Sequence, residues 1–577
     1  MNVRKLKKII EVAGGKSPAD LVIRNCRIVD PISQTVSEGS IGVYDGFIIG
    51  IGDYEGKRVV DGEGCFAVAG LIDSHVHIES SMCTPEAYGS LVVPMGTTCV
   101  IADPHEICNV RGVSGLRFMM NSSERTPLKV KFMIPSCVPA TEFEDSGAVL
   151  DSEKIEELIG EPKILGLGEM MNSTGVINCN EEVLEKITSA INKSKIIDGH
   201  GPMLKGKSLN AYRVSGVLTD HECSTPEEVR DRLKRGMYVL LREGSAARNL
   251  ANLLEAVNDG NSRRCAMCSD DKHPEDIIAN GHINHNLKIA VREGVNVFSA
   301  IAMATINAAE CYKLKNTGLI APGYMADIVL FKDLKDFEAK MVFINGEPVA
   351  KDGKALFPLV NRVDKAVTHS VNIKPVTSSD LKIPLKKDMV RVIGLDKYSL
   401  NTVLQKRKVK IVQGCFEVSP EADIKKLFVI ERHNATGKIG KALIENYGIR
   451  NGAIGTTIAH DSHNIIVSGD NDRDILAAIR ELENAGGGIT LVKDGTVIET
   501  LSLPIGGIMS DMDAFSVSKK MERMKKTAHE ELNVSTDVDP FMTLSFLALP
   551  VIPSLKVTPR GLFDVDKFDF VPMEWEE

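Results

Sequence analysis

The sequence predicts an α/β protein with a central (β/α)₈ TIM barrel, a composite β-sandwich domain and a C-terminal α+β domain. Three observations support this prediction. Eight apolar segments between residues 67 and 318 each end in a polar residue and precede a helix-period stretch. Short β-rich segments lie on both sides of that region. After about residue 358 the pattern changes to longer strands and a few helices.

The β-rich flanks predict one domain built from two separated segments. Between residues 20 and 60, short apolar runs are separated by Asp-Gly and Gly turns. The same sequence pattern occurs again between residues 318 and 354. We expect residues 1–66 and 319–365 to pair into one β-sandwich. The basic first sixteen residues predict a short amphipathic helix.

The central region, residues 67–318, predicts the barrel. Its eight expected strands are AVAGLID, TTCVIAD, KVKFMIP, KILGLGE, KIIDGH, GVLTDH, YVLLRE and RCAMCSD. Eight β-to-α units over roughly 250 residues are typical of a TIM barrel, whose active site lies at the C-terminal ends of the strands. Residues 366–577 are then expected to form the α+β domain.

Composition excludes several classes of function. A net charge of −9 without a long basic run argues against a nucleic-acid partner, and the sequence has no apolar run long enough to predict a membrane span. The N-terminus lacks the features of a signal peptide, and twelve scattered cysteines favour reduced thiols in the cytoplasm. Cys265 and Cys268 form a CxxC, which we interpret as two buried side chains in preference to a redox pair. We expect a small-molecule substrate; the sequence leaves the formation of a homo-oligomer open.

Five histidines stand at or just beyond expected strand ends: His75, His77, His105, His200 and His221. The first two are two residues apart, so in an extended strand both side chains point to the same side and can reach one cation. A single histidine at such a position is more often a hydrogen-bonded structural residue. Five at one rim favour a metal site.

Carboxylates complete this rim. Glu169 ends the fourth strand, Glu222 follows the sixth, and Asp270 and Asp271 follow the eighth. Glu169 lies opposite the His-x-His strand of a closed barrel, so we take it as the candidate bridge between two cations. The alternative for any one of them is a solvated loop carboxylate or a helix cap, and for Asp271 it is a turn.

The segment from Gly70 to Ser81, GLIDSHVHIESS, resembles the first-strand motif of the amidohydrolase superfamily, and specifically of its bacterial-type adenine deaminases. Further blocks agree with that family over nearly the whole chain. They are DPHE at 103–106, EMMN at 169–172, DGH at 198–200, DHE at 220–222, SDDKHP at 269–274, HDSHN at 460–464 and LPIGGIMSD at 503–511.

The resemblance implies two divalent metal ions per chain. The implied ligands of the first metal are His75, His77 and Asp270, and those of the second are His200 and His221. Glu169 is the implied bridge between the two metals. Glu169 would stand where many relatives carry a carbamylated lysine. Imidazole and carboxylate ligands suit zinc, manganese and iron. The absence of a thiolate ligand and the resemblance together favour Mn²⁺ or Fe²⁺, with Zn²⁺ also compatible.

The implied activity is hydrolytic deamination of adenine to hypoxanthine and ammonia, a purine-salvage reaction. Two cations sharing a water lower its pKa, so that hydroxide would attack C6. Asp270 would then pass the water's proton to the departing amine. Related deaminases carry an acid shortly after the fifth-strand histidine, but here His200 is followed by Gly-Pro-Met-Leu. The candidates for the acid that protonates the ring are Glu222, Asp103, His105 and Glu106, with Asp271 in reserve.

Purine recognition should combine apolar walls with a few placed polar groups. The candidates are Glu79, Ser80, Asp103, Asn172, Arg242, Ser245 and His463. Each has the alternative of an ordinary loop residue that bonds the backbone. His463 belongs with His460 and Asp461 to a polar segment between two strands, which we expect to close over the substrate. The alternative for this segment is a simple polar turn.

Three other functions were weighed. A cyclic-amide hydrolase of the same superfamily is expected to have a bridging lysine at the fourth strand, where this chain has Glu169. A catalytically silent binding protein would hold no metal. A nucleic-acid deaminase would need H-x-E and P-C-x-x-C patterns, and no proline precedes Cys265.

Overall fold

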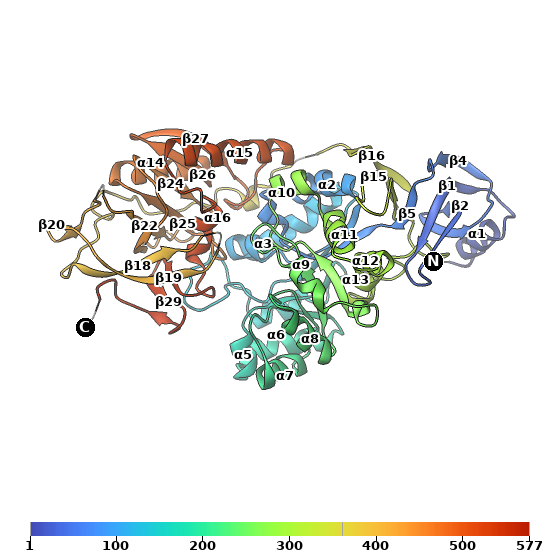
Figure 1. Cartoon of the computed structure of the whole chain (residues 1–577), viewed down its shortest axis with the longest axis horizontal. Coiled ribbons are helices and arrows are strands. Elements are labelled where there is room, and N and C mark those ends of the chain that lie inside the picture. Colours follow the sequence, from blue (N-terminus) through green and yellow to red (C-terminus); the bar gives the residue numbers. More distant parts are fainter. Residues whose placement is uncertain (1, 361, 398, 420, 576–577) are drawn as a thin grey trace.

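The computed structural model describes residues 2–360, 362–397, 399–419 and 421–575. Figure 1 shows an elongated molecule with the N-terminal sheet at one end, the barrel in the middle and the C-terminal domain at the other end. The first described helix, α1 (Val3–Ala13), buries only Val12 and packs against the N-terminal sheet. No helix among the described residues is long and apolar enough to cross a membrane.

The two chain segments that flank the barrel share one nine-stranded sheet. β5 (Phe66–Ala69) pairs antiparallel with β14 (Ile328–Phe331), with Val68 opposite Val329. The remaining strands are β1 (Ala19–Asp30), β2 (Thr35–Tyr44), β3 (Phe47–Ile51), β4 (Gly56–Asp61), β15 (Ala339–Ile344), β16 (Glu347–Lys351) and β17 (Lys354–Ala355). The sheet order is β17-β16-β15-β14-β5-β1-β2-β3, with β4 beside β1. The chain therefore leaves this sheet for the barrel and returns to it.

The barrel consists of two parallel arcs that meet. The strands of the first arc are β6 (Leu71–Val76), β7 (Thr97–Ala102), β8 (Lys129–Ile134), β9 (Ile164–Met170) and β10 (Ile196–Gly199). Those of the second are β11 (Thr219–Asp220), β12 (Tyr238–Arg242) and β13 (Cys265–Cys268). Val76 bridges Asp270 in parallel, and the Leu218 N–H donates to the Ile197 carbonyl at 2.9 Å. These two contacts close the barrel, as predicted.

The first barrel strand differs from the sequence prediction. The expected strand AVAGLID is divided at Gly70, so that residues before it belong to β5 and residues after it to β6. A Cβ atom at Gly70 would lie 2.1 Å from the Thr98 Oγ1 atom. The close approach to Thr98 therefore requires glycine where the chain passes from one sheet to the other.

Helices cover the outside of the barrel, which explains why its strands are apolar on both faces. α8 (Pro226–Lys234) shows the local signals: Thr225 and Glu228 form a capping box, Pro226 occupies the first turn and Val229 faces the core. The other helices are α2 (Pro85–Val92), α3 (His105–Ser122), α4 (Ser152–Leu158), α5 (Ser173–Ile177), α6 (Glu181–Asn192), α7 (Gly206–Val214), α9 (Leu250–Leu253), α10 (Pro274–Asn280), α11 (Ile283–Arg292), α12 (Val297–Met303) and α13 (Ile306–Cys311).

The C-terminal domain is built on an eight-stranded sheet of order β19-β18-β23-β22-β25-β24-β26-β27. These strands are β18 (Met389–Leu395), β19 (Thr402–Lys408), β22 (Ile424–Ile430), β23 (Ile439–Glu445), β24 (Gly452–Thr456), β25 (Ile465–Gly469), β26 (Gly488–Lys493) and β27 (Thr496–Ser502). Small strands complete it: β20 (Ile411–Val412), β21 (Cys415–Phe416), β28 (Leu555–Thr558), β29 (Gly561–Asp564) and β30 (Asp569–Phe570). α14 (Asp472–Ala485) packs on the sheet.

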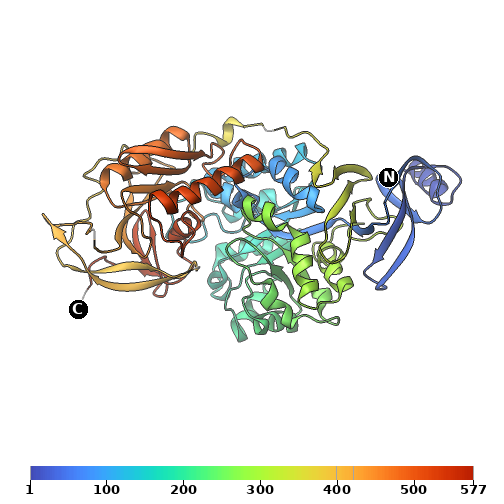
Figure 2. The same ribbon diagram turned by 45° about the horizontal axis from the view of Figure 1, so that its top comes forward.

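This domain docks on the barrel through one long helix. α15 (Ala514–Glu531) packs against α10 and α2 of the barrel, and Figure 2 shows it lying along the boundary between the two. Lys525 of α15 reaches the Glu275 carboxylate at 2.7 Å and the Asp539 carboxylate at 2.7 Å. α16 (Met542–Ser545) and the loop of residues 457–464, between β24 and β25, lie beside this boundary. The C-terminal domain therefore contributes residues near the barrel mouth.

Candidate active site

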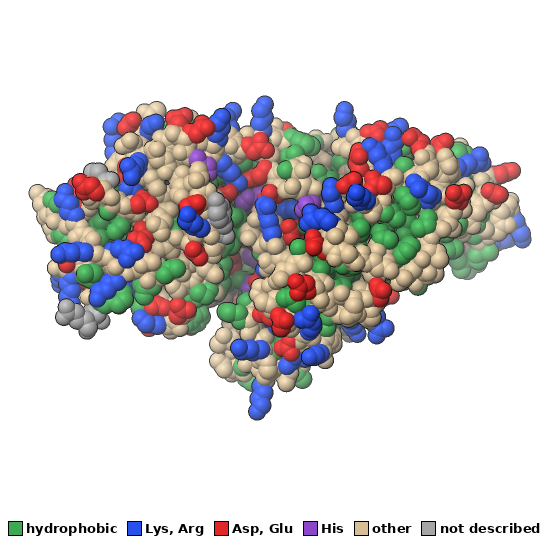
Figure 3. All heavy atoms as spheres, viewed as in Figure 1, with side chains coloured by type: hydrophobic (Ala, Val, Ile, Leu, Met, Phe, Trp, Pro, Cys, Tyr) green, Lys and Arg blue, Asp and Glu red, His purple; other side chains and the backbone are tan. Residues whose placement is uncertain are grey.

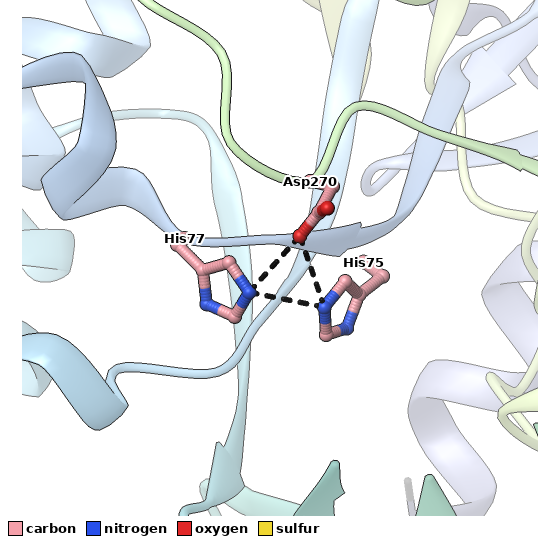
Figure 4. A group of neighbouring side chains, drawn as sticks. All are labelled: His75, His77 and Asp270. Atoms are coloured by element: carbon pink, nitrogen blue, oxygen red, sulfur yellow. Dashed lines mark hydrogen bonds and ion pairs between the residues drawn. The ribbon is translucent and has the colours of Figure 1, made fainter. Parts of the chain in front are cut away.

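Three predicted ligands converge at the end of the first barrel strand. His75 and His77 come from β6 and its end, and Asp270 follows β13. Figure 4 shows the three side chains pointing toward one another. The His77 Nε2 atom lies 3.2 Å from His75 Nε2 and 3.1 Å from Asp270 Oδ1, and His75 Nε2 lies 3.6 Å from the same oxygen. Three ligand atoms thus face one point, as one cation requires.

Glu169, at the end of β9, lies between the two groups of histidines. Its Oε2 atom is 2.8 Å from His200 Nδ1 and 3.2 Å from His221 Nε2, while its Oε1 atom is 3.5 Å from His77 Nε2. The His221 ring stacks on His75 with 4.0 Å between centroids. The structure therefore brings together all six predicted ligands, with the carboxylate of Glu169 in a bridging position.

Buried polar contacts fix the orientation of these side chains. His77 Nδ1 lies 2.9 Å from the Asp103 carbonyl oxygen, to which it donates, and this leaves Nε2 free to bind a metal. The Asp103 carboxylate accepts the Glu169 N–H at 2.8 Å. Asp73 accepts the N–H groups of His75 at 3.3 Å and of Ser269 at 3.0 Å, and so joins β6 to β13. Asp103 and Asp73 therefore hold the backbone of the strands that carry the ligands.

Glu169, Asp270 and His75 are in the charge states that suit a cation. Burial lowers the pKa values of the other three ligand histidines, His77, His200 and His221, but neighbouring carboxylates outweigh it and raise them. Burial alone raises the pKa of Glu169 and Asp270, but nearby cationic groups, His200 for Glu169 and Arg242 for Asp270, together with hydrogen bonds from histidines, hold both pKa values well below the usual range. Burial, reinforced by repulsion from His221, lowers the pKa of His75 to about 4. Ionised carboxylates and a neutral imidazole are the forms that bind metals. The donor set therefore fits two divalent ions.

Arg242 and Glu222 form an ion pair beside this cluster. The Arg242 guanidinium donates to the Glu222 carboxylate and, at 2.8 Å, to Asp270 Oδ2. Burial raises the pKa of Glu222, but attraction to Arg242 outweighs it and lowers the pKa below its ordinary value. Glu222 is thus held by Arg242 at the edge of the ligand cluster. Arg242 holds two carboxylates in place.

A second polar cluster joins the barrel to the C-terminal domain. Glu106, in the first turn of α3, contacts His460 Nδ1 at 2.7 Å and also accepts from His463 Nε2. His105 lies between the two clusters, with Nδ1 3.2 Å from Glu169 and Nε2 3.6 Å from Glu106. The 457–464 loop therefore reaches the barrel mouth, where the sequence analysis expected it.

Two connected cavities lie between the barrel and the C-terminal domain. The smaller has apolar walls that include Met82, Ile508, Met542 and Phe546. The larger cleft is lined in part by the predicted ligands. The residues that line both are Glu106, Asp271, His273, His460, Met542 and Phe546. Figure 3 shows histidine side chains in the groove between the two domains.

The other candidate residues divide into two groups. Glu79, Ser80 and Asp271 line the smaller cavity, where Ser80 Oγ donates to Asp271 Oδ1 at 2.5 Å and burial raises the pKa of Glu79 to about 7. Asn172 instead caps α5 by accepting the Gly175 N–H at 2.7 Å, and it is not among the cavity-lining residues. Asn172 therefore bonds the backbone, as the alternative for these candidates describes.

Comparisons with known proteins agree over most of the chain. A sequence model of the amidohydrolase family matches residues 66–349, and one of the adenine deaminase C-terminal domain matches residues 399–569. An adenine deaminase of Nitratidesulfovibrio vulgaris is 49% identical and covers 98% of both chains. Adenine deaminase 2 of Carboxydothermus hydrogenoformans is 47% identical and covers 99% of this chain and 100% of its own. The chain belongs to the adenine deaminase family.

Solved structures match more than half of this adenine deaminase family member. A triazine hydrolase variant is 14% identical, with a TM-score of 0.45, and covers 58% of this chain and 96% of its own. Atrazine chlorohydrolase from Arthrobacter aurescens TC1, complexed with zinc, has the same identity and TM-score and covers 59% of this chain and 97% of its own.

Sequence reasoning missed two features of the site in this family member. Asp73 was not singled out, although it is a buried carboxylate two residues before the first ligand. The pairing of Glu106 with His460 joins residues 354 positions apart and was not predicted. The signal available for it was two blocks of the family motif, DPHE and HDSHN, each with histidine and carboxylate residues outside the implied metal ligands.

Proposed function

We propose that the chain hydrolyses adenine to hypoxanthine and ammonia with the help of two divalent metal ions. The observation that carries this proposal is the position of Glu169 between His77 on one side and His200 and His221 on the other. Its relatives named adenine deaminase are similar over nearly the whole chain, which supports the choice of substrate.

The proposed metal ligands are the six strand-end residues. His75, His77 and Asp270 would hold one ion, His200 and His221 the other, and Glu169 both. Mn²⁺ or Fe²⁺ is favoured because the set contains no thiolate ligand, and Zn²⁺ is also compatible with imidazole and carboxylate ligands. When bound, the ions act as Lewis acids and lower the pKa of water, which supplies the nucleophile at neutral pH.

Asp270 is the proposed proton carrier. Its Oδ1 atom faces the ligand cluster while Arg242 holds Oδ2 at 2.8 Å, so the carboxylate is ionised and oriented. Oδ1 would accept one proton of the attacking water and deliver it to N6 of the purine, so that the amine departs as ammonia. The second oxygen stays bound to the guanidinium throughout.

The smaller cavity is the proposed purine site. Its lining is mostly apolar with a few polar side chains, which is typical of small-molecule sites. Met82, Ile508 and Phe546 would cover the faces of the flat ring and exclude water. Glu79 and Asp271 would contact its polar edges, with Ser80 orienting Asp271. A cytoplasmic location is proposed because all twelve cysteines are free thiols.

The direct test is a product assay on protein purified after growth in Mn²⁺. We expect hypoxanthine and ammonia from adenine in equal amounts, with adenosine and cytosine as parallel substrates, and about two equivalents of bound metal by elemental analysis. Turnover of adenosine but not of adenine would reject the proposed substrate. Protein without bound transition metal and without turnover would instead support a binding function.

A further inference from the structure

The carboxylate of Glu106 and the imidazole of His460 form a buried pair across the domain boundary. His460 Nδ1 lies 2.7 Å from Glu106 Oε1, and both residues are less than one-tenth exposed. Glu106 belongs to α3 of the barrel and His460 to the 457–464 loop of the C-terminal domain. A carboxylate that accepts a hydrogen bond from one imidazole nitrogen fixes the tautomer, and the other nitrogen stays free to transfer a proton.

The proton positions on the neighbouring His463 can be assigned from its contacts. The Ala459 N–H donates to His463 Nδ1 at 3.2 Å, so Nδ1 has no hydrogen and Nε2 donates to Glu106 Oε2. Burial lowers the pKa of His463 to about 4, so this imidazole is neutral. Its Nε2 lone pair is unavailable, which argues against a third metal ion here. Because His463 is neutral, it does not neutralise the negative charge of Glu106, which attracts His460.

His460 also lies beside the cavities. Its ring stacks on Phe546 with 4.3 Å between centroids and an interplanar angle of 22°. The ring lines both the small cavity and the ligand-lined cleft. Among the described residues, His460 Nε2 has no hydrogen-bond partner. This N–H group is therefore available at the junction between the proposed purine site and the proposed metal ligands.

The charged groups around His460 favour its cationic form. Burial lowers the pKa of His460, but the charge and hydrogen bond of Glu106 on α3, together with Asp271 after β13 and Asp461 of the same loop, raise it to about 9. His463 of the same loop and His105 of α3 share Glu106 with it. The segment of residues 541–548, which packs Phe546 on the ring, has no titratable side chain.

We propose that His460 is the acid that protonates N1 of the purine ring. This inference deepens the proposed adenine deamination and rests on it. Among the acids predicted from the sequence, Glu222 is bound by the Arg242 guanidinium, and the carboxylate of Asp103 accepts the Glu169 N–H. Because His200 is followed by Gly201, the fifth strand has no acid in the expected place. The C-terminal domain supplies one instead.

The proton balance of this step closes. As the water oxygen bonds to C6, the electron pair of the C6–N1 π bond moves to N1 and takes the proton of His460 Nε2, while Nδ1–H stays on Glu106. Asp270 transfers one proton of the water to N6, the C6–N6 bond breaks, and ammonia leaves. The remaining water proton is released as the C6 carbonyl forms, and it returns to Nε2. The sum is adenine plus water giving hypoxanthine plus ammonia.

The test compares kcat and KM for adenine from pH 5.5 to 10 in the parent protein and four Mn²⁺-loaded variants. Removing an acid that transfers a proton in the transition state costs roughly 10²- to 10³-fold in rate. We expect His460→Gln to lose that factor in kcat, with KM changed only a few-fold, and to lose the alkaline fall in kcat. In Glu106→Gln the alkaline fall should move from near pH 9 to below pH 7, because the anion that raises the pKa is gone.

Controls separate catalysis from structure. His463→Gln should keep the alkaline fall at its original pH, and His369→Gln, at an exposed histidine, should match the parent protein. Metal content should be equal in all variants. A His460→Gln variant within a few-fold of the parent kcat, or one that is slower with an unchanged pH profile, would overturn the proposal.

Two further outcomes are distinguishable. If His460→Gln does not fold, the Glu106→Gln profile decides, and an unshifted alkaline fall rejects the role of His460. If the parent protein does not turn over adenine at all, the proposed function itself is wrong.

Discussion

Replacing Arg432 with methionine should both destabilise the C-terminal domain and slow turnover. Arg432 is fully buried and donates to carbonyl groups of three separate segments: His463, Ser370 at 2.8 Å and Gly506 at 2.9 Å. A Cβ atom on Gly507 would lie 2.9 Å from the Arg432 guanidinium, so the backbone there packs closely on it. One side chain thus joins the segment around Ser370, the 457–464 loop and the loop after β27.

The size of the effect follows from these contacts. Hydrogen bonds from a charged group contribute about 1.5–3 kcal/mol each, and three carbonyls would lose their partner. Relief of the cost of burying the guanidinium, several kcal/mol for an ion, offsets part of this loss. We expect the free energy of unfolding to fall by about 3–5 kcal/mol, within the range for breaking a buried polar network.

Urea denaturation followed by circular dichroism measures the stability change, and steady-state kinetics measures turnover. Because the loop that carries His460 would no longer be held, kcat should fall about ten-fold or more, a change of roughly 1.4 kcal/mol in barrier. Metal content should not change, since the proposed ligands all belong to the barrel. Arg432→Lys should be intermediate, because lysine keeps the charge without the planar fork. A loss below 1 kcal/mol in the methionine variant, or a loss of metal, would refute this reasoning.

Three other changes test separate parts of the molecule. Glu169→Gln should lower bound metal below the parent level, as measured by elemental analysis of dialysed protein, because the central carboxylate loses its charge. Asp270→Asn should reduce kcat for adenine about 10²- to 10⁴-fold, since the amide cannot accept a proton; unchanged kcat would remove Asp270 from proton transfer. Lys525→Met should destabilise the protein by about 3 kcal/mol at pH 7, because it removes the lysine that the largely buried Glu275 and Asp539 carboxylates share. Burial raises the pKa of both carboxyls, but hydrogen bonding and attraction by His273 and Lys525 lower the net pKa, so their contribution is present above their unfolded pKa values and is lost as pH falls below about 4. Acid unfolding monitored by fluorescence should therefore be steeper in the parent than in the variant.

The barrel could be predicted from the sequence because its signals are local. Each strand is a short apolar run with its functional residue at the C-terminal end, and the eight runs lie in chain order around the barrel. The composite sheet could be inferred for a similar reason, since both halves repeat the same turn-rich texture. The point where one sheet ends and the other begins was not predictable, because it depends on the contact between Gly70 and Thr98.

The candidate site was predictable to different degrees at its two ends. The ligands at the metal end follow strands, so their spacing and barrel order bring them together. The contacts at the other end join residues more than 300 positions apart, such as Glu106 with His460 and Glu144 with Ser462. A polar loop between two strands has the same sequence pattern whether it faces solvent or another domain. No local periodicity distinguishes these cases.

This difference suggests how the two domains divide the chemistry. The barrel holds the proposed metal ligands and Asp270, which activate water and carry its proton. The C-terminal domain supplies Phe546 and His460, which close the small cavity and hold a proton on the opposite side of the purine. Because the pair of Glu106 and His460 forms only when the domains dock, the acid and the enclosed cavity are assembled together. Proton delivery would then be confined to the closed site. Bulk water is excluded from that site, and the ring is positioned for attack at C6.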